Sequence, residues 1–129
     1  MGKSRLLICL LFIAGNAFSL DFDKLYNSWS DNLNVSHGTY SAEKGAKLWG
    51  YEMFPGKSCS SCHGDDLTKS GRHTKTNKVI KPLSPSANPN RLTKEKKINK
   101  WLKRNCKFTY KRTCTAEEKI NFIEFIKNN

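Results

Sequence analysis

Apolar residues recur at helical spacing from residue 22 onward. In the first stretch the apolar positions follow the starting one by three, four, seven and eleven residues, at Phe22, Leu25, Tyr26, Trp29 and Leu33. Such spacing gathers apolar side chains on one face of an amphipathic helix. The segment His37 to Thr39 breaks the pattern, and Ser41 can then cap a second helix that carries Leu48 and Trp49.

Two further helices are expected in the second half of the chain. Thr93 can cap the first of them. Its expected buried stripe is Ile98, Trp101 and Leu102, and the next position of that stripe is Asn105. Thr115 and Glu118 form a capping box before a final apolar run, at Ile120, Phe122, Ile123, Phe125 and Ile126. No strand pattern stands out, so the sequence predicts an all-α domain of about four to five helices.

The region from Gly64 to Asn90 shows no sustained helical or strand period. It contains Gly71, Pro82, Pro85 and Pro89 among many serines and asparagines, which is typical of an extended loop. A long loop in a compact domain usually has something to wrap. We expect this one to follow the edge of a cofactor, with Val79, Ile80 and Leu83 as apolar contacts.

The N-terminus has the pattern of a secretory signal peptide. Lys3 and Arg5 precede an apolar run from Leu6 to Ala14, and small residues extend to Ser19. The run is about half as long as a bilayer-spanning helix, so we expect no membrane span in the mature chain. With Ala17 at the minus-three position, we expect cleavage after Ser19. Residues 20–129 then form a single domain, which we expect to be a monomer.

Positive charge dominates the chain and gathers in one segment. The formal net charge is +12, and removal of Lys3 and Arg5 lowers it by two. Between residues 91 and 112 the only acid is Glu95, against Arg91, Lys94, Lys96, Lys97, Lys100, Lys103, Arg104, Lys107, Lys111 and Arg112. Such a segment can be a solvated helix face or a binding surface. Because secretion argues against a nucleic acid partner, we expect instead an acidic redox partner, such as an acidic cytochrome, or a small anion.

The most specific chemical signal is the pentapeptide from Cys59 to His63, which fits the C-x-x-C-H pattern of covalent haem attachment. On a helical turn Cys59 and Cys62 share one face, so both thiols can reach the vinyl groups of one haem. His63 then lies beneath the ring as the proximal iron ligand, and its second nitrogen can donate to a backbone carbonyl. The alternatives are a redox pair or half of a zinc site. A zinc ribbon needs a second C-x-x-C, whereas Cys106 and Cys114 are eight residues apart.

The remaining cysteines suggest a disulfide. Cys9 leaves with the signal peptide, and Cys59 and Cys62 are assigned to haem c. In an oxidising compartment the remaining pair, Cys106 and Cys114, is most simply joined. Haem c and a disulfide together indicate the periplasm.

The second axial ligand is left open by the residues alone. Met53 is the only methionine of the mature chain, and it precedes Cys59 by six residues, too near the proximal side to reach the opposite face. The other donors are His37, His73 and side-chain amides. Asn105 follows the expected buried stripe, where an unpaired amide costs on the order of 1–3 kcal/mol. It can also serve simply as the cap at the end of its helix.

The helices around the C-x-x-C-H turn resemble those of class I cytochromes c, in which the first and last helices cross through a glycine and aromatic residues. Gly45 with Trp49, and Phe122 with Phe125, match these roles. Gly45 is costly inside a helix, by about 1 kcal/mol relative to alanine, so close approach of another helix is expected. The resemblance also implies a methionine ligand after the haem motif, which this chain lacks.

A more specific resemblance covers the chain from about Ala42 to the C-terminus. The stretches 80–87, 89–91, 100–106, 112–115 and 118–119 are similar to the sphaeroides haem protein family. That resemblance implies that Asn105, directly before the first disulfide cysteine, ligates the ferric iron together with His63. It implies that Asn105 leaves on reduction and opens the iron to oxygen, nitric oxide or carbon monoxide. It also implies a disulfide between Cys106 and Cys114.

Three functions from different classes therefore compete. The first is a cytochrome that is reduced by a partner and binds a diatomic ligand on its ferrous haem. The second is a plain electron carrier with bis-histidine ligation by His63 and His73. The third is an enzyme, such as a peroxidase or a reductase of oxygen or nitric oxide, with a basic residue such as Arg104 near the iron. No acid and base stand at catalytic spacing, so the enzyme ranks last.

Overall fold

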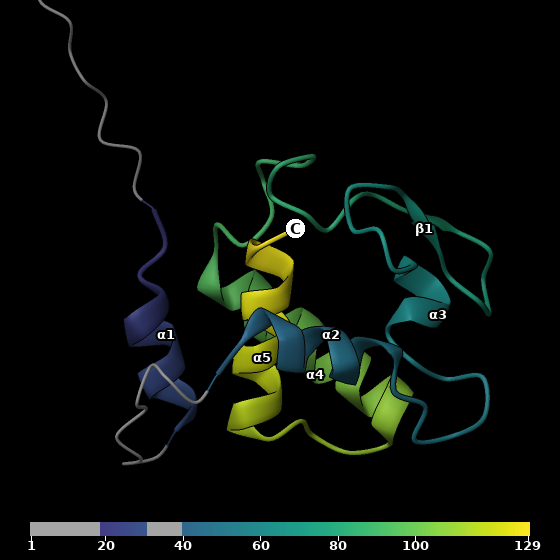
Figure 1. The fold of residues 1–129 in the computed structure, drawn as a ribbon, viewed down its shortest axis with the longest axis horizontal. Helices are drawn as coiled ribbons and strands as arrows, with labels where there is room; N and C mark the ends of the chain where they lie inside the picture. Colours follow the sequence, from purple (N-terminus) through teal and green to yellow (C-terminus); the bar gives the residue numbers. More distant parts are fainter. Residues whose placement is uncertain (1–18, 31–39) are drawn as a thin grey trace, which may run out of the picture.

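The computed structural model describes residues 19–30 and 40–129. Residues 1–18 of the predicted signal peptide lie outside this part, as do Leu33 and the predicted break at residues 37–39, which includes the candidate ligand His37. The described part is mostly helical, as predicted (Figure 1). Its elements are α1 (Phe22–Trp29), α2 (Ala42–Gly50), α3 (Ser60–His63), β1 (Gly71–Arg72), β2 (Val79–Ile80), α4 (Glu95–Tyr110) and α5 (Ala116–Lys127).

Two of the three predicted helix caps are confirmed. The hydroxyl of Ser41 accepts the backbone N–H of Lys44 at 3.1 Å and starts α2. Thr115 and Glu118 form the reciprocal capping box of α5. The cap predicted at Thr93 is wrong, because its hydroxyl donates to the carbonyl of Asn90 at 3.1 Å and α4 begins after Lys94 with no side-chain cap.

The crossing of α2 and α5 forms the centre of the fold (Figure 1). A Cβ atom added to Gly45 would overlap the carbonyl oxygen of Asn121 and lie 2.6 Å from Cβ of Phe125. The two backbones therefore approach as closely as glycine alone permits. One turn later the ring of Trp49 lies 6.1 Å from that of Phe122 and 5.5 Å from that of Phe125. The predicted crossing through a glycine and aromatic residues is confirmed.

Two apolar clusters lie on the two sides of α5. The first holds Trp49, Leu67, Cys106, Tyr110, Cys114, Phe122 and Ile126. The second joins α1 to α4 and α5, through Leu25, Tyr26, Ile98, Ile120 and Ile123. No helix among the described residues is both long and apolar enough to cross a membrane.

The buried stripe of α4 differs from the prediction. Its buried and partly buried core positions are Ile98, Leu102, Cys106, Thr109 and Tyr110. Trp101 is 47% exposed and Asn105 is exposed, so the predicted burial of both against the chain is wrong. The helix also continues to Tyr110, into the segment between the two disulfide cysteines. This extension lets Cys106 and Tyr110, one turn apart, carry the stripe into the first cluster.

The loop from Gly64 to Asn90 contains a small sheet that the sequence did not predict. Gly71 pairs with Ile80, and Arg72 with Val79, in antiparallel register. Val79 is 61% exposed, Ile80 is half-buried, and Leu83 packs against the first cluster. The side chain of Arg91 fixes the later part of the loop, because its guanidinium donates to the carbonyls of Lys81 and Pro82, each at 2.8 Å.

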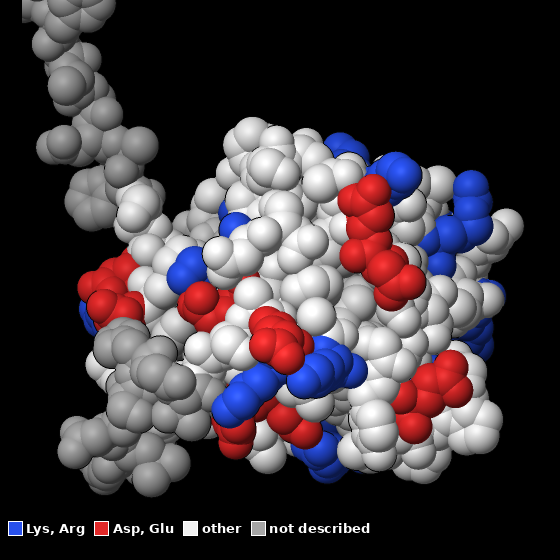
Figure 2. All heavy atoms as spheres, in the orientation of Figure 1, with Lys and Arg blue, Asp and Glu red and all other residues white. Residues whose placement is uncertain are grey.

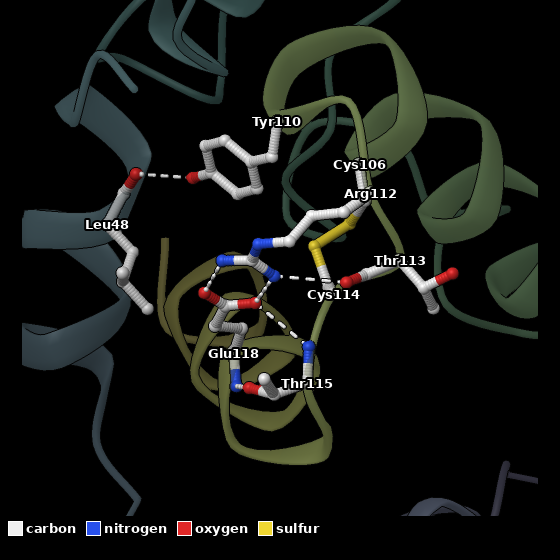
Figure 3. Close-up of a disulfide and its surroundings, with 8 residues drawn as sticks. All are labelled: Leu48, Cys106, Tyr110, Arg112, Thr113, Cys114, Thr115 and Glu118. Carbon is white, nitrogen blue, oxygen red and sulfur yellow. Dashed lines mark hydrogen bonds and ion pairs between the residues drawn. A yellow bond between two sulfur atoms is a disulfide. The ribbon is translucent and has the colours of Figure 1, made fainter. Parts of the chain in front are cut away.

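Cys106 and Cys114 form the predicted disulfide, which ties the last turn of α4 to the start of α5 (Figure 3). Both residues are 4% exposed. Beside the bridge, Arg112 donates to the two carboxylate oxygens of Glu118 at 2.8 and 2.7 Å. The hydroxyl of Tyr110 donates to the carbonyl of Leu48 at 3.1 Å, so this corner also holds α4 against α2.

Candidate haem site

The helical turn α3 presents all three residues of the attachment motif. The N–H of His63 donates to the carbonyl of Cys59 at 3.1 Å, and that of Gly64 to Ser60 at 2.8 Å. Gly64 then takes a φ of +71°, a left-handed conformation that favours glycine and ends the turn. At the start, Ser58 Oγ accepts the N–H of Ser61 at 3.2 Å. The two thiols and the imidazole are therefore presented from one fixed turn.

His63 has the properties of a neutral metal ligand. Burial lowers the pKa of its imidazole to about 4, and the charges of Arg91 and His73 add to the shift. Its Nδ1 atom is buried and has no hydrogen-bond partner within the described residues. The predicted hydrogen bond from the ring to a backbone carbonyl is therefore absent at Nδ1. A buried polar atom without a partner in a folded protein indicates a partner of another kind, such as a cofactor.

Cys59 and Cys62 are both free thiols, although they stand three residues apart on one turn. Cys62 is buried and Cys59 is half-buried. Burial raises the pKa of the Cys59 thiol to about 12, so this thiol stays protonated at neutral pH. Two shielded thiols and a buried neutral imidazole on one turn fit the covalent attachment of a single haem c.

Trp49 joins this turn to the central crossing. Its indole N–H donates to the carbonyl of Gly64 at 2.8 Å, and its ring lies 5.5 Å from that of His63. The same ring packs on Phe125 of α5. The residue after His63 is therefore fixed directly to the most closely packed part of the fold.

The hairpin of β1 and β2 closes over the other side of the turn. A Cβ atom at Gly71 would overlap the carbonyl oxygen of Cys62 and lie 2.8 Å from Cα of His63. The N–H of Thr74 points at the sulfur of Cys62 at 3.4 Å. Glycine at position 71 is thus required for the hairpin to pack against the attachment motif.

A second face of α4 is turned away from the core. It carries Trp101, Asn105 and Phe108, which follow one another by four and three residues and so lie along one side of the helix. The exposed Asn105 side chain makes no hydrogen bond to the described residues. Because α4 continues for five more residues, Asn105 is not a cap at the helix end. This face therefore presents an amide between two aromatic rings.

The hairpin meets this face of α4 at Phe108. The ring of His73 lies 5.5 Å from that of Phe108. The Nδ1 atom of His73 accepts two backbone N–H groups, from Lys75 at 3.2 Å and from Thr76 at 3.1 Å. In the neutral ring this leaves the proton on Nε2. To ligate iron through Nε2, His73 would have to give up both hydrogen bonds.

The other candidate residues have contacts of their own. Met53 packs against the first cluster. The guanidinium of Arg104, the basic residue considered for an enzyme, lies 5.2 Å from the ring of Trp101. Neither Phe108 nor the contact of Gly71 with the motif was predicted from the sequence. The three-residue spacing from Asn105 to Phe108 was a usable signal, whereas nothing in the sequence shows what Gly71 touches.

Comparisons with known proteins agree on the class of protein. Residues 35–126 match a family model described as "Domain of unknown function (DUF1924)". Over 89 residues the chain is 42% identical to "Cytochrome c-type protein SHP" of Cereibacter sphaeroides, and the match covers 66% of this chain and 68% of that protein.

Solved structures give the same result. The fold is similar to that of oxidized SHP, described as an oxygen binding cytochrome c, with a TM-score of 0.70, 33% identity, and coverage of 86% of this chain and 99% of that one. It is also similar to oxidized cytochrome c'' from Methylophilus methylotrophus, with a TM-score of 0.65, 25% identity and coverage of 81% and 90%. A solution structure of that cytochrome c'' is described as giving insights into haem-ligand detachment.

Proposed function

Because the chain belongs to the sphaeroides haem protein family, we propose that it is a periplasmic monohaem c-type cytochrome that exchanges an amide ligand for a diatomic one. Cys59 and Cys62 hold the haem covalently, and His63 is the proximal ligand. The haem supplies an iron that accepts one electron and, when ferrous, binds oxygen, nitric oxide or carbon monoxide. Asn105 would be the second protein ligand of the iron while it is ferric, and reduction would release it.

The observation that carries this proposal is the position of the Asn105 amide between Trp101 and Phe108. An aromatic pair on a helix face turned away from the core suits an apolar, planar group better than water. The amide between them has no hydrogen-bond partner within the described residues, so ligation costs it no existing bond. A neutral amide is a hard and weak donor, which suits ferric iron better than ferrous iron.

The bis-histidine electron carrier is the weaker alternative for a local reason. The two backbone N–H groups that His73 accepts hold the turn at the tip of the hairpin. If His73 turned to the iron, this turn would lose both bonds, each worth about 0.5–1.5 kcal/mol. Asn105 has no such cost. Ligation by Asn105 therefore leaves the hairpin unchanged.

Replacing Asn105 with alanine tests the ligand assignment. We expect the ferric Asn105→Ala protein to be five-coordinate or water-ligated, as seen by optical and electron paramagnetic resonance spectra, with the haem still attached. His73→Ala is the matched variant and is expected to keep the six-coordinate ferric spectrum. A wild-type ferrous protein that is low-spin and ignores carbon monoxide, together with a His73→Ala protein that binds it, would establish the bis-histidine carrier instead.

Covalent attachment is tested separately. Acid-acetone extraction removes haem that is held only by ligation, whereas thioether bonds survive it. We expect the colour to stay with the polypeptide. Loss of the pigment to the organic phase would show that Cys59 and Cys62 are not thioether-linked.

The proposed function requires an electron donor. Given the excess of basic residues, we propose an acidic redox protein as the donor, with no role for nucleic acid, and a monomeric cytochrome. Sedimentation of the purified holoprotein checks the oligomeric state. A dimer at micromolar concentration would contradict this part of the proposal.

A further inference from the structure

Lysines from three separate segments meet around Phe108. The ammonium groups of Lys57 and Lys111 lie 5.6 and 5.7 Å from the centre of its ring, within the range of cation–π attraction. Lys75 lies at the tip of the hairpin, where its N–H donates to the His73 ring that packs on Phe108. These four residues, Lys57, Lys75, Lys111 and Phe108, are called the lysine cluster below.

The lysine cluster has no counter-charge of its own. Among the ion pairs of the described residues, none includes Lys57, Lys75 or Lys111. Glu52, the nearest acid in sequence to Lys57, accepts the N–H of Gly56 at 3.0 Å. The neighbouring Lys57, and then Lys75, lower the pKa of the Lys111 ammonium, as expected when like charges are held together. Such an arrangement attracts anionic groups.

The cluster also adjoins the attachment motif. Lys57 precedes Cys59 by two residues, and Tyr110, two residues after Phe108, lies beside Cys59. In Figure 1 the loop before α3, the hairpin and the end of α4 all lie at the right side of the molecule. An anionic surface bound here would therefore lie next to the attachment motif.

An exposed aromatic residue extends this surface. Phe54 is 39% exposed, and its carbonyl accepts the N–H of Lys57 at 3.0 Å. Protein interfaces combine an apolar centre with a charged rim. By contrast, the face seen in Figure 2 carries acidic and basic groups beside one another. Within α2, Lys47 pairs with Glu43 at 2.9 Å.

We propose that the lysine cluster is the docking point of an acidic redox partner, whose surface carboxylates neutralise Lys57, Lys75 and Lys111. This inference rests on the proposed function, because that function requires an electron from another protein. It also changes the expectation from the sequence. Two of the three lysines lie outside the basic segment from Arg91 to Arg112, so the docking point is set by the fold and not by the charge of α4 alone.

The test compares two triple variants with equal loss of charge. The first replaces Lys57, Lys75 and Lys111 with glutamine. The control replaces Lys96, Lys97 and Lys100, which are exposed on the first half of α4. Stopped-flow measurements follow reduction of each ferric holoprotein by a fully reduced flavodoxin of net negative charge, which serves as the acidic probe.

At low ionic strength we expect the cluster variant to be reduced about tenfold more slowly than the wild type, since steering by local charge changes association rates by at least this factor. The control variant should slow by less than about threefold. At about 1 M salt, where the Debye length is about 3 Å, the three proteins should react at similar rates. Arginine at positions 57, 75 and 111 should restore the fast reaction.

Three outcomes would overturn the docking proposal. Equal slowing of the two triple variants would assign steering to the net charge. If neither variant were slowed, the lysine cluster would not be a docking surface. If the cluster variant slowed only the oxidation of the ferrous protein by ferricyanide and not its reduction by flavodoxin, the cluster would bind small anions and not a protein.

Carbon monoxide binding separates this inference from the function on which it rests. The reduced cluster variant should bind carbon monoxide as the wild type does, because none of its substitutions alters a proposed ligand. If the reduced wild type itself does not bind carbon monoxide, the proposed function is wrong. The comparison of reduction rates still shows where an acidic donor docks.

Discussion

The crossing of α2 and α5 differs sharply from the outer face of α4. At the crossing, Gly45 lies against the backbone of Asn121, and the ring of Trp49 fills the space beside it. On the outer face of α4, Trp101 is 47% exposed and the Asn105 amide has no hydrogen-bond partner within the described residues. Close packing fixes the residues at the crossing, whereas the outer face of α4 carries exposed groups without contacts that fix them.

This difference suggests that the two regions have different roles, one in fixing the attachment motif and the other in carrying the proposed exchangeable ligand. Trp49 bonds to Gly64 and so fixes the proximal side of the site to the crossing. Asn105 lies on a helix held elsewhere, by Ile98, Leu102 and Cys106 on its core side. The proposed release of Asn105 on reduction needs such an arrangement, because departure of the ligand must not disturb the core. Substitutions in each region separately therefore test whether the two roles are independent.

The largest effect is expected at the crossing. Gly45→Ala places a methyl group onto the carbonyl oxygen of Asn121, which neither backbone can avoid without moving the helices apart. We expect the free energy of unfolding to fall by about 3 kcal/mol or more. Urea denaturation of the holoprotein, followed by circular dichroism, measures the loss.

Gly50→Ala is the matched control, since it makes the same change in the same helix. No atom lies within 4 Å of the added Cβ at Gly50. Alanine there should be neutral or stabilising by up to about 1 kcal/mol, because glycine is the poorer helix former. If the two variants lose equal stability, close helix approach does not explain Gly45.

The disulfide comes next, since it lies between the two regions (Figure 3). Replacing both Cys106 and Cys114 with alanine should cost about 2–3 kcal/mol, by the chain-entropy model for a loop of this length. Because Cys106 follows Asn105 directly, the ferric spectrum should also show a larger five-coordinate or water-ligated fraction. A variant that loses stability but keeps the wild-type ferric spectrum would limit the disulfide to a structural role.

The sequence predicted the crossing of α2 and α5 better than it predicted the outer face of α4. The crossing was predictable because Gly45, Trp49, Phe122 and Phe125 depend on local spacing and on one resemblance. The attachment motif is a contiguous pentapeptide, from Cys59 to His63, and was equally visible. In both cases the role of each residue can be inferred from its type and its spacing along the chain.

The outer face of α4 was predicted only in part. The buried stripe from Ile98 continues through Cys106 to Tyr110, because the helix extends past the first disulfide cysteine. The predicted stripe led instead to Asn105, the residue before Cys106. The hairpin was missed because strands of two residues have no period to detect. The contacts of Phe108 with His73, Lys57 and Lys111 join distant segments, and a single sequence does not contain that information.

Gly71→Ala is expected to affect the site more than the fold. Its Cβ would overlap the Cys62 carbonyl, and the short hairpin can move away more easily than a core helix can. We expect a loss of about 1–2 kcal/mol. We also expect a changed rate of carbon monoxide binding, because the hairpin carries the His73 ring that covers Phe108. Unchanged ligand kinetics would show that the hairpin does not border the ligand side of the haem.

The smallest effect is expected from the ion pair between Arg112 and Glu118, beside the disulfide. The hydrogen bond from Arg112 lowers the pKa of the Glu118 carboxyl below its ordinary value near 4.5, since it stabilises the charged form. A lowered pKa in the folded state contributes stability above the unfolded value, and this contribution is lost as the pH falls through the folded pKa. Because Glu118 is partly exposed, the expected contribution at pH 7 is no more than about 1 kcal/mol.

The comparison of wild type with Glu118→Gln isolates this contribution. Glutamine keeps the shape but has no charge to lose, so the wild type should be the more stable at pH 7 and the difference should shrink below about pH 4. Thermal unfolding of both proteins between pH 3 and pH 7 measures it, with the pH values chosen to bracket the carboxyl pKa. A difference that stays constant over this range would show that Glu118 acts through its capping hydrogen bonds and not through the charge of its partner Arg112.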